Sequence, residues 1–204
     1  MSDLSIDAAP PGAAQAWFGD AFERLHPLLQ RLHRGGGMLE GVIAIDTGPG
    51  IAGVLGRRLA ARLGVPVAHQ QCRFQVHISH ESHRMVWARR FIFPDGSSRQ
   101  LTSIFTPHGA YPDGYWSETT GAMTLRLGVD ITAGGGWQWR PMRVRLAGVP
   151  LPLSLFPTSR AGKRIENQQY RFQVVFSMPF LGRLLEYGGL LTPVFASPAD
   201  KQYP

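Results

Sequence analysis

Apolar positions in the first sixty or so residues show helical spacing on either side of one strand. From 13 to 34 they recur every three or four residues. Pro27 lies inside this run, so we expect one helix to end near His26 and another to begin there. The glycines at 35–37 should end the second helix. Residues 38–46 alternate as a strand does, and 50–63 form an apolar stripe with arginines opposite, which predicts a third, amphipathic helix.

After residue 70 the pattern changes to strict alternation, most clearly at 123–131. We expect about seven consecutive strands with short turns, a bulge or sheet edge at Pro141, and an extended connector at 149–157. Strands of about ten residues exceed the usual five or six, which favours a strongly curved or closed sheet. The predicted fold class is α+β, mostly β: a long antiparallel meander forming a curved sheet or barrel, with one or two short N-terminal helices packed on it.

Composition supports one compact domain. The chain has 204 residues, of which 44% are hydrophobic and 17% charged, enough to build a sizeable core. We expect a flexible arm at 1–12, a single β-rich domain at 13–195 and a C-terminal tail at 196–204. No secretory signal and no membrane-spanning apolar run are apparent in the sequence. The single cysteine, Cys72, excludes an internal disulfide framework and favours a cytoplasmic location.

The net charge of +7 comes almost entirely from scattered arginines. We interpret most of them as solvated or internally paired. A functional anionic partner, either nucleic acid or an anionic membrane, is the alternative. Because no helix-turn-helix, zinc-finger or RRM signature accompanies the charge, nucleic acid is not the expected partner.

The stretch DTGPGIAGVLG, at 46–56, matches the dinucleotide-binding pattern G-x-G-x-x-G. That pattern also requires a second parallel strand and an acidic residue about 20 positions further on, and neither is present. We therefore interpret the stretch as a structural strand-to-helix corner, with anion binding at the helix N-terminus as the alternative. The sequence predicts no cofactor.

The spacing of His77, His80 and His83 suggests a metal-binding site. A hairpin turn at 79–82 would place His77 and His83 on opposite faces, so we expect solvated turn histidines instead, although a three-residue loop would reverse this. Cys72 is expected to be a buried structural thiol, since it has no local activating motif. No metal site and no catalytic triad are predicted.

The strongest candidates for a ligand site lie at 87–90 and in the aromatic segment 107–121. Alternation places Trp87 and Arg89 on one face of a strand and Arg90 on the other, so one arginine should be buried. A buried arginine needs a carboxylate, such as Glu118, Glu166 or Glu186. The alternative for 107–121 is a packed loop that seals one end of the barrel. The candidate ligand-binding residues are Trp87, Arg89, Arg90, Tyr115, Trp116, Glu118 and Glu166.

Six segments, in their order along the chain, carry a family resemblance. They are LHPLLQRLHR, GPGIAGVLGRRLAARLGVP, WARRF, PHGAYPDGYWSETTGAMTLRL, LAGVPLPLSLFP and YRFQVVFSMPFLGRLLEYGGLL. Over residues 20–192 the chain resembles the bacterial family catalogued as domain of unknown function 4166. The resemblance implies one compact bacterial domain, which occurs alone or behind a nucleotide-binding reductase-like domain, and it assigns no catalytic residue.

Three functions are consistent with these observations. The first is a barrel-like module that binds a small apolar or amphipathic ligand, because the strands are long, aromatics are many and no complete catalytic motif is present. The second is an enzyme for a small anionic or carbonyl substrate, with Arg89 or Arg90 holding the anion and Glu118 or Glu166 as acid or base. The third is an accessory domain of a separately encoded reductase.

Overall fold

A computed structural model describes residues 12–81, 83–153 and 158–195. Four short helical elements precede or follow the first strand. They are α1 (Ala13–Phe18), the 3-10 helix η1 (Gly19–Arg24), α2 (Pro27–Gly35) and α3 (Gly50–Leu63). As predicted, η1 ends before Pro27 and α2 begins at it, with the His26 Nδ1 accepting the Leu28 backbone N–H at 3.2 Å. The predicted arm and tail lie almost entirely outside the described residues.

Apart from a short 3-10 helix, η2 (Ala133–Gly135), the remaining elements of the described chain are strands. The strands are β1 (Gly37–Thr47), β2 (Gln71–Glu81), β3 (Arg84–Ile92), β4 (Ser98–His108), β5 (Tyr115–Thr120), β6 (Met123–Ile131), β7 (Trp137–Leu146), β8 (Val149–Leu151), β9 (Thr158–Glu166), β10 (Gln169–Met178) and β11 (Gly182–Val194). Each pairs antiparallel with its sequence neighbour, except that β9 pairs with β7, and β8 is an appendage of β7.

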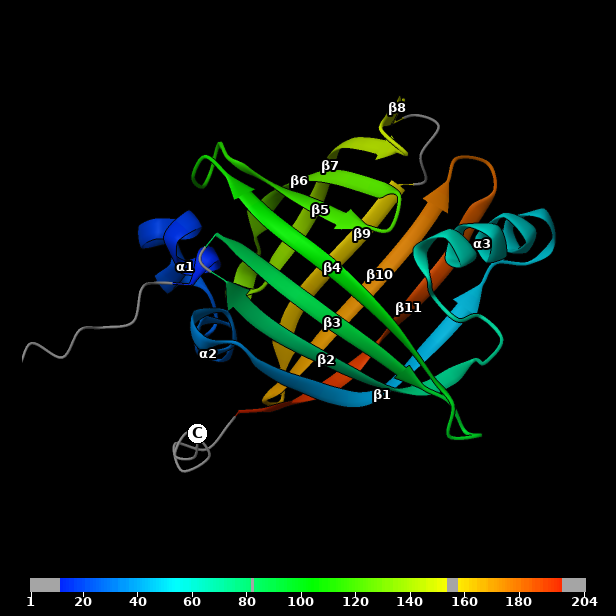
Figure 1. The fold of residues 1–204 in the computed structure, drawn as a ribbon, viewed down its shortest axis with the longest axis horizontal. Coiled ribbons are helices and arrows are strands. Elements are labelled where there is room, and N and C mark those ends of the chain that lie inside the picture. The colour runs from blue at the N-terminus through cyan, green and yellow to red at the C-terminus, as the bar shows by residue number, and fades with distance from the viewer. Residues whose placement is uncertain (1–11, 82, 154–157, 196–204) are drawn as a thin grey trace, which may run out of the picture.

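Closure of the sheet is confirmed. β1 pairs with β11 over ten residue pairs, from Met38↔Val194 to Thr47↔Leu185, and β6 pairs with β7, so ten of the strands in the described chain form a closed barrel (Figure 1). The weakest contact in its wall joins β7 to β9, which pair only from Trp137↔Lys163 to Trp139↔Ala161. Inward-facing positions alternate along each strand, so the core lies inside the barrel.

Helices α1 and α2, with η1, cover one end of the barrel, which we call the cap end. The Trp17 ring packs edge-on against Trp116 at 5.5 Å between centroids, and Phe18 lies 5.3 Å from Trp137. Backbone hydrogen bonds tie the cap to the strand ends: Tyr111 N–H donates to the Trp17 carbonyl at 3.0 Å. Aromatic rings thus seal this end, as the alternative interpretation of 107–121 expected.

Helix α3 lies at the opposite end, beside the start of β11 (Figure 1). A Cβ on Gly56 would stand 1.9 Å from the Leu184 carbonyl oxygen, and one on Gly48 would stand 2.0 Å from that of Arg183. Glycines therefore allow the helix to approach the strand backbone closely. The strand after α3 is β2, which is antiparallel to β1, so the glycine pattern belongs to a structural corner and not to a nucleotide-binding βαβ unit.

Two local predictions need correction, and a third is confirmed. The hairpin turn predicted at 79–82 is wrong, because the β2–β3 ladder continues to the pair Glu81↔Arg84. The segment 107–121 is not one loop, since β5 begins at Tyr115. The predicted bulge at Pro141 is confirmed: Arg126 pairs with Arg143 and Leu127 with Pro141, so that one residue of β7 is skipped.

We predict that Gly56→Ala destabilises the protein, because the new methyl group would collide with the backbone of β11. The free energy of unfolding should fall by about 2 kcal/mol, typical of overpacking at a tight contact. Gly35→Ala is the matched control, since a Cβ there meets nothing within 4 Å. Urea denaturation of both variants measures the difference, and equal stabilities would show that α3 is not held by this contact.

Candidate functional site

The barrel encloses a cavity of about 120 Å³ between its two ends. This size is comparable to that of apolar cavities of about 150 Å³ that bind benzene. The wall is mostly aromatic and aliphatic, with Phe74, Phe105, Trp139 and Phe172 among its side chains. Leu63 of α3 lines it from the α3 end, Gly162 lines it within the short β7–β9 pairing, and Pro141 lines it two residues beyond the last paired residue of β7. The polar side chains in the wall are Arg89, Glu118, Thr120, Lys163, Tyr170 and Tyr187.

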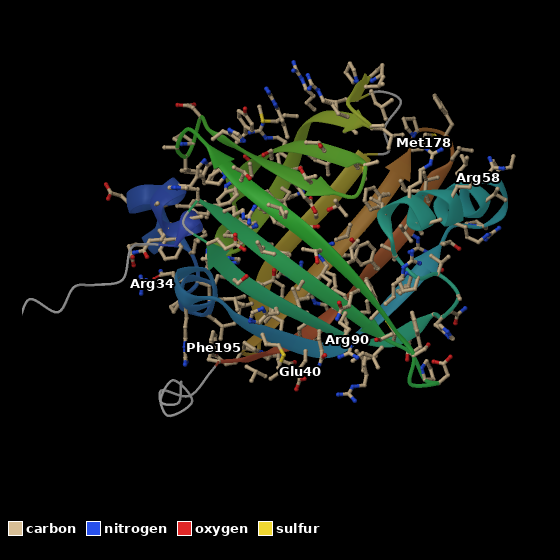
Figure 2. The ribbon with its side chains drawn as sticks, viewed as in Figure 1. Arg34, Glu40, Arg58, Arg90, Met178 and Phe195 are labelled. Atoms are coloured by element: carbon tan, nitrogen blue, oxygen red, sulfur yellow. The ribbon has the colours of Figure 1, made fainter. Side chains whose placement is uncertain are left out.

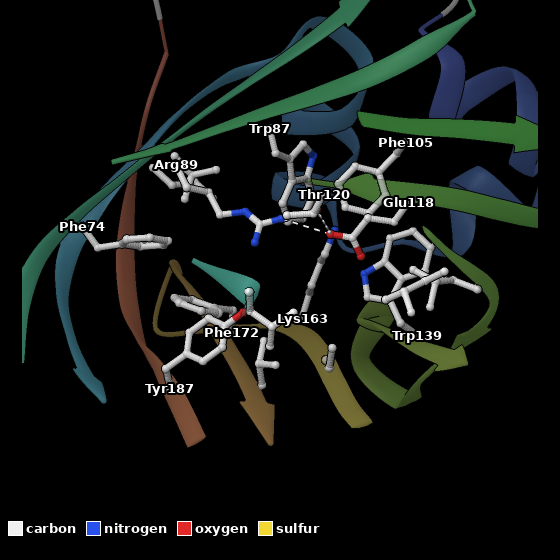
Figure 3. Close-up of a pocket in the computed structure, with 18 of the residues that line it drawn as sticks. Phe74, Trp87, Arg89, Phe105, Glu118, Thr120, Trp139, Lys163, Phe172 and Tyr187 are labelled. Atoms are coloured by element: carbon white, nitrogen blue, oxygen red, sulfur yellow. Dashed lines mark hydrogen bonds and ion pairs between the residues drawn. The ribbon is translucent and has the colours of Figure 1, made fainter. Parts of the chain in front are cut away.

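A buried ion pair inside this cavity joins β3 to β5 across the intervening strand β4 (Figure 3). Arg89 Nη2 on β3 lies 3.2 Å from Glu118 Oε1 on β5, and the two side chains are only 12% and 17% exposed. Arg89 Nη2 also donates to Ser103 Oγ at 2.5 Å. Thr120 completes the network, with its hydroxyl 2.5 Å from that of Ser103 and 3.3 Å from Glu118 Oε1. Strand alternation directs all four side chains inward.

Lys163 of β9 places its buried side-chain amine among tryptophan rings. Its Nζ lies 3.7 Å from the ring centroid of Trp87, 4.1 Å from that of Trp137 and 5.1 Å from that of Trp139. Within the described part of the chain this nitrogen has no hydrogen-bond partner. Burial sets the pKa of Lys163 well below its usual 10.5, an effect that nearby Glu118 opposes and Arg89 reinforces.

Hydrogen-bonding groups remain unused around the ion pair. The Arg89 Nε and the Tyr170 hydroxyl are buried and have no partner among the described residues. Burial raises the pKa of Tyr170 well above 10.0, an effect partly offset by Arg89, so its hydroxyl remains protonated and able to donate. Unused buried donors are costly, and at a cavity wall they are available to a ligand.

Two histidines, His33 of α2 and His80 of β2, pack together where the cap meets the barrel. His33 of α2 is fully buried, with its ring 4.5 Å from that of Trp137 and 6.2 Å from that of His80. Burial lowers the pKa of both histidines, and Lys163 adds to the effect. His80 is therefore packed against the cap and is not the solvated turn residue that the sequence suggested.

The structure brings together three of the predicted site residues, Trp87, Arg89 and Glu118, at the cavity wall. The others lie elsewhere. Trp116 is buried against the cap. Arg90 bonds Ser98 outside the barrel, Tyr115 stacks on His108, and Glu166 pairs with Arg164 and Arg171 on an exposed strand end.

Sequence reasoning missed Lys163, Tyr170 and Tyr187. Lys163 and Lys201 are the chain's two lysines, and alternation within TSRAGKRIE places Ala161, Lys163 and Ile165 on one face. This alternation is the signal in the sequence that could have placed Lys163 inside the barrel. For Tyr170 and Tyr187, alternation predicts a face, whereas only closure of the barrel shows that they share a cavity with Arg89.

No group of three or more His, Cys, Asp or Glu side chains able to hold a metal ion occurs among residues 12–81, 83–153 and 158–195. The buried Cys72 fits the predicted structural role, and burial raises the pKa of its thiol.

Within the same described ranges, no helix has the length and apolar character needed to span a membrane.

Comparison with known families extends this picture. The model of the family described as Domain of unknown function (DUF4166) matches residues 25–191. The chain belongs to this family. The comparison with curated proteins found no match. All cavity-lining residues, from Leu39 to Leu191, fall inside the DUF4166 range, whereas α1 of the cap precedes it.

We predict that Glu118→Gln lowers the free energy of unfolding by about 3 kcal/mol, because it leaves the Arg89 charge uncompensated in the barrel. Glu81→Gln removes the exposed partner of Arg84, whose pair is about half exposed, and should change stability by less than about 1 kcal/mol. Chemical denaturation of both variants gives the comparison. Equal losses would mean that the Arg89–Glu118 pair is as well solvated as a surface pair.

We predict that Lys163→Met stabilises the protein, since methionine fills a similar volume without an ionisable group. The folded-state pKa of Lys163 lies below its unfolded value of 10.5, so the unfolded chain binds more protons between the two. The lysine therefore destabilises the fold most at low and neutral pH, and its penalty disappears as pH rises toward 10.5. Thermal melts from pH 6 to 10.5 should show the gain from Lys163→Met shrinking with pH. A gain independent of pH would contradict this.

Proposed function

We propose that this protein binds a small amphipathic ligand inside its barrel. The observation that carries the proposal is the coexistence of an apolar cavity with a compact polar cluster in its wall. Ligand sites of this kind combine mostly hydrophobic walls with a few polar groups that fix orientation. The family assignment identifies the domain but names no ligand. The proposal therefore rests only on the chemistry of the cavity.

The polar end of such a ligand would meet Arg89 and Tyr170. Arg89 Nε and the Tyr170 hydroxyl both offer unused protons, and both suit a carbonyl, hydroxyl or carboxylate oxygen. The apolar end would lie among the phenylalanine and leucine side chains of the wall. The narrow β7–β9 seam, where Gly162 and Pro141 line the cavity, is the entry route that fits this orientation.

A second candidate is an enzyme for a small anionic or carbonyl substrate. Convergence of Arg89 and Glu118 at 3.2 Å in one cavity favours it, with Arg89 binding the substrate and Glu118 acting as acid or base. Arg90 and Glu166 face outward and take no part in this version. If the protein is an enzyme, it converts a supplied carbonyl compound into product, and Glu118→Gln abolishes that conversion. If it is a binding module, the compound is recovered unchanged after incubation with the protein.

Two broader expectations belong with this proposal. A cytoplasmic, bacterial setting fits the single buried cysteine and the family resemblance. Function as an accessory domain of a separately encoded reductase would be recognised by co-purification of the two proteins.

The proposal is tested with butanoate and 1-butanol, which suit a cavity of this size, share an alkyl chain and differ in the charge of the polar end. Trp87 and Trp139 line the cavity, so intrinsic fluorescence and calorimetry should both report binding. Ala161→Phe narrows the cavity and should weaken binding at least about tenfold, equivalent to about 1.4 kcal/mol.

Val175→Phe is the matched control, because Val175 lies outside the cavity, beside the inward-facing Val174 on β10. It should change the affinity less than about twofold. Native mass spectrometry of the purified protein adds a direct search for a retained ligand. Absence of a retained molecule, together with no binding of either probe, would falsify the proposal.

A further inference from the structure

The exposed apolar side chains at the α3 end form a patch that the cavity does not explain. Phe180, in the turn between β10 and β11, is 107% exposed, and its neighbour Leu181 is 36% exposed. On α3, Ile51 is 70% and Val54 43% exposed. Large apolar side chains gathered at a protruding end indicate an interaction surface.

These two segments are neighbours in the fold. The Gly48 N–H, just before α3, donates to the Leu184 carbonyl at 3.0 Å, and Gly56 packs on the same carbonyl. Leu184 follows the Phe180 turn by four residues. Figure 2 shows Met178, at the end of β10, and Arg58 of α3 at the same end of the molecule, away from Arg34 of the cap. Phe180, Leu181, Ile51 and Val54 therefore define one region, which we call the tip patch.

The charge around the tip patch is positive. Helix α3 contains Arg57, Arg58 and Arg62 and no acidic residue, and all three arginines are exposed. None of them forms a salt bridge within the described part of the chain. Nearby Asp46 and Glu186 are both paired with Arg183.

The backbone also holds Phe180 in an uncommon conformation. Its φ is +65°, in the left-handed region that bulky residues rarely adopt. The turn therefore presents an aromatic side chain to solvent at some conformational cost.

We infer that the tip patch docks the protein on an anionic lipid surface. Phe180, Leu181 and Ile51 would enter the interface, while the α3 arginines contact anionic headgroups. A bilayer fits better than a protein partner, because the apolar side chains sit on a projecting turn and a helix flanked by unpaired arginines, not in a groove. The inference does not require that the cavity hold a ligand.

Co-sedimentation with vesicles tests it, using phosphatidylcholine alone and phosphatidylcholine containing phosphatidylglycerol. Wild-type protein should bind the anionic vesicles, and rising salt should weaken that binding. The double variant Phe180→Ser/Ile51→Ser should bind at least tenfold more weakly. Val42→Ser/Leu190→Ser is its control, because these two exposed residues form a cross-strand pair on the barrel wall.

Arg57→Gln/Arg58→Gln should also weaken binding at least tenfold. Its control, Arg24→Gln/Arg31→Gln, makes the same change of net charge on the cap elements η1 and α2 and should bind within twofold of wild type. Thermal melts confirm that each variant is folded. The inference is overturned if wild type does not bind anionic vesicles, if each variant matches its control, or if the tip patch instead forms a dimer that Phe180→Ser/Ile51→Ser dissociates.

Discussion

Closure of the sheet is the constraint on which the rest of this structure depends. Once β1 pairs with β11 and β6 with β7, alternate residues of ten strands in the described chain face a shared interior. Any charged side chain on that face must then be compensated within the barrel. Arg89 meets this requirement through Glu118 and Ser103, which come from the two strands that follow β3. A one-residue slip of register would send Arg89 outward and bring Arg90 inside.

The interior contains more polar chemistry than a packing role needs. An apolar side chain in place of Lys163 would avoid the cost of burying an amine among three tryptophan rings. The unused hydrogen-bonding capacity of Arg89 and Tyr170 adds a further cost. Polar groups of this kind, concentrated beside a cavity, are typical of sites where function rather than stability sets the residue types. The buried polar groups that cost the fold stability are thus the same groups that would bind the proposed ligand.

The two ends of the barrel have different physical characters. At the cap end, Trp17 and Phe18 pack on rings of the strand ends, and His33 packs against Trp137. At the α3 end, apolar side chains and arginines face solvent, while Leu63 reaches the cavity from the same helix. Helix α3 therefore contributes residues both to the cavity wall and to the tip patch.

Local patterns in the sequence determined most of the secondary structure of this protein and the faces on which its side chains lie. Alternation predicted the strands other than β5, β8 and β9, together with the opposite orientations of Arg89 and Arg90, and Pro27 marked the break between η1 and α2. The sequence also predicted that a buried arginine would pair with one of three carboxylates, of which Glu118 was one. Only the tertiary structure decided among them, because that choice depends on which strands become neighbours. The same holds for Lys163, Tyr170 and Tyr187, which come from strands β9, β10 and β11 and meet Arg89 only across the closed barrel. Periodicity within a strand is a local property, whereas a cavity is formed by residues far apart in sequence.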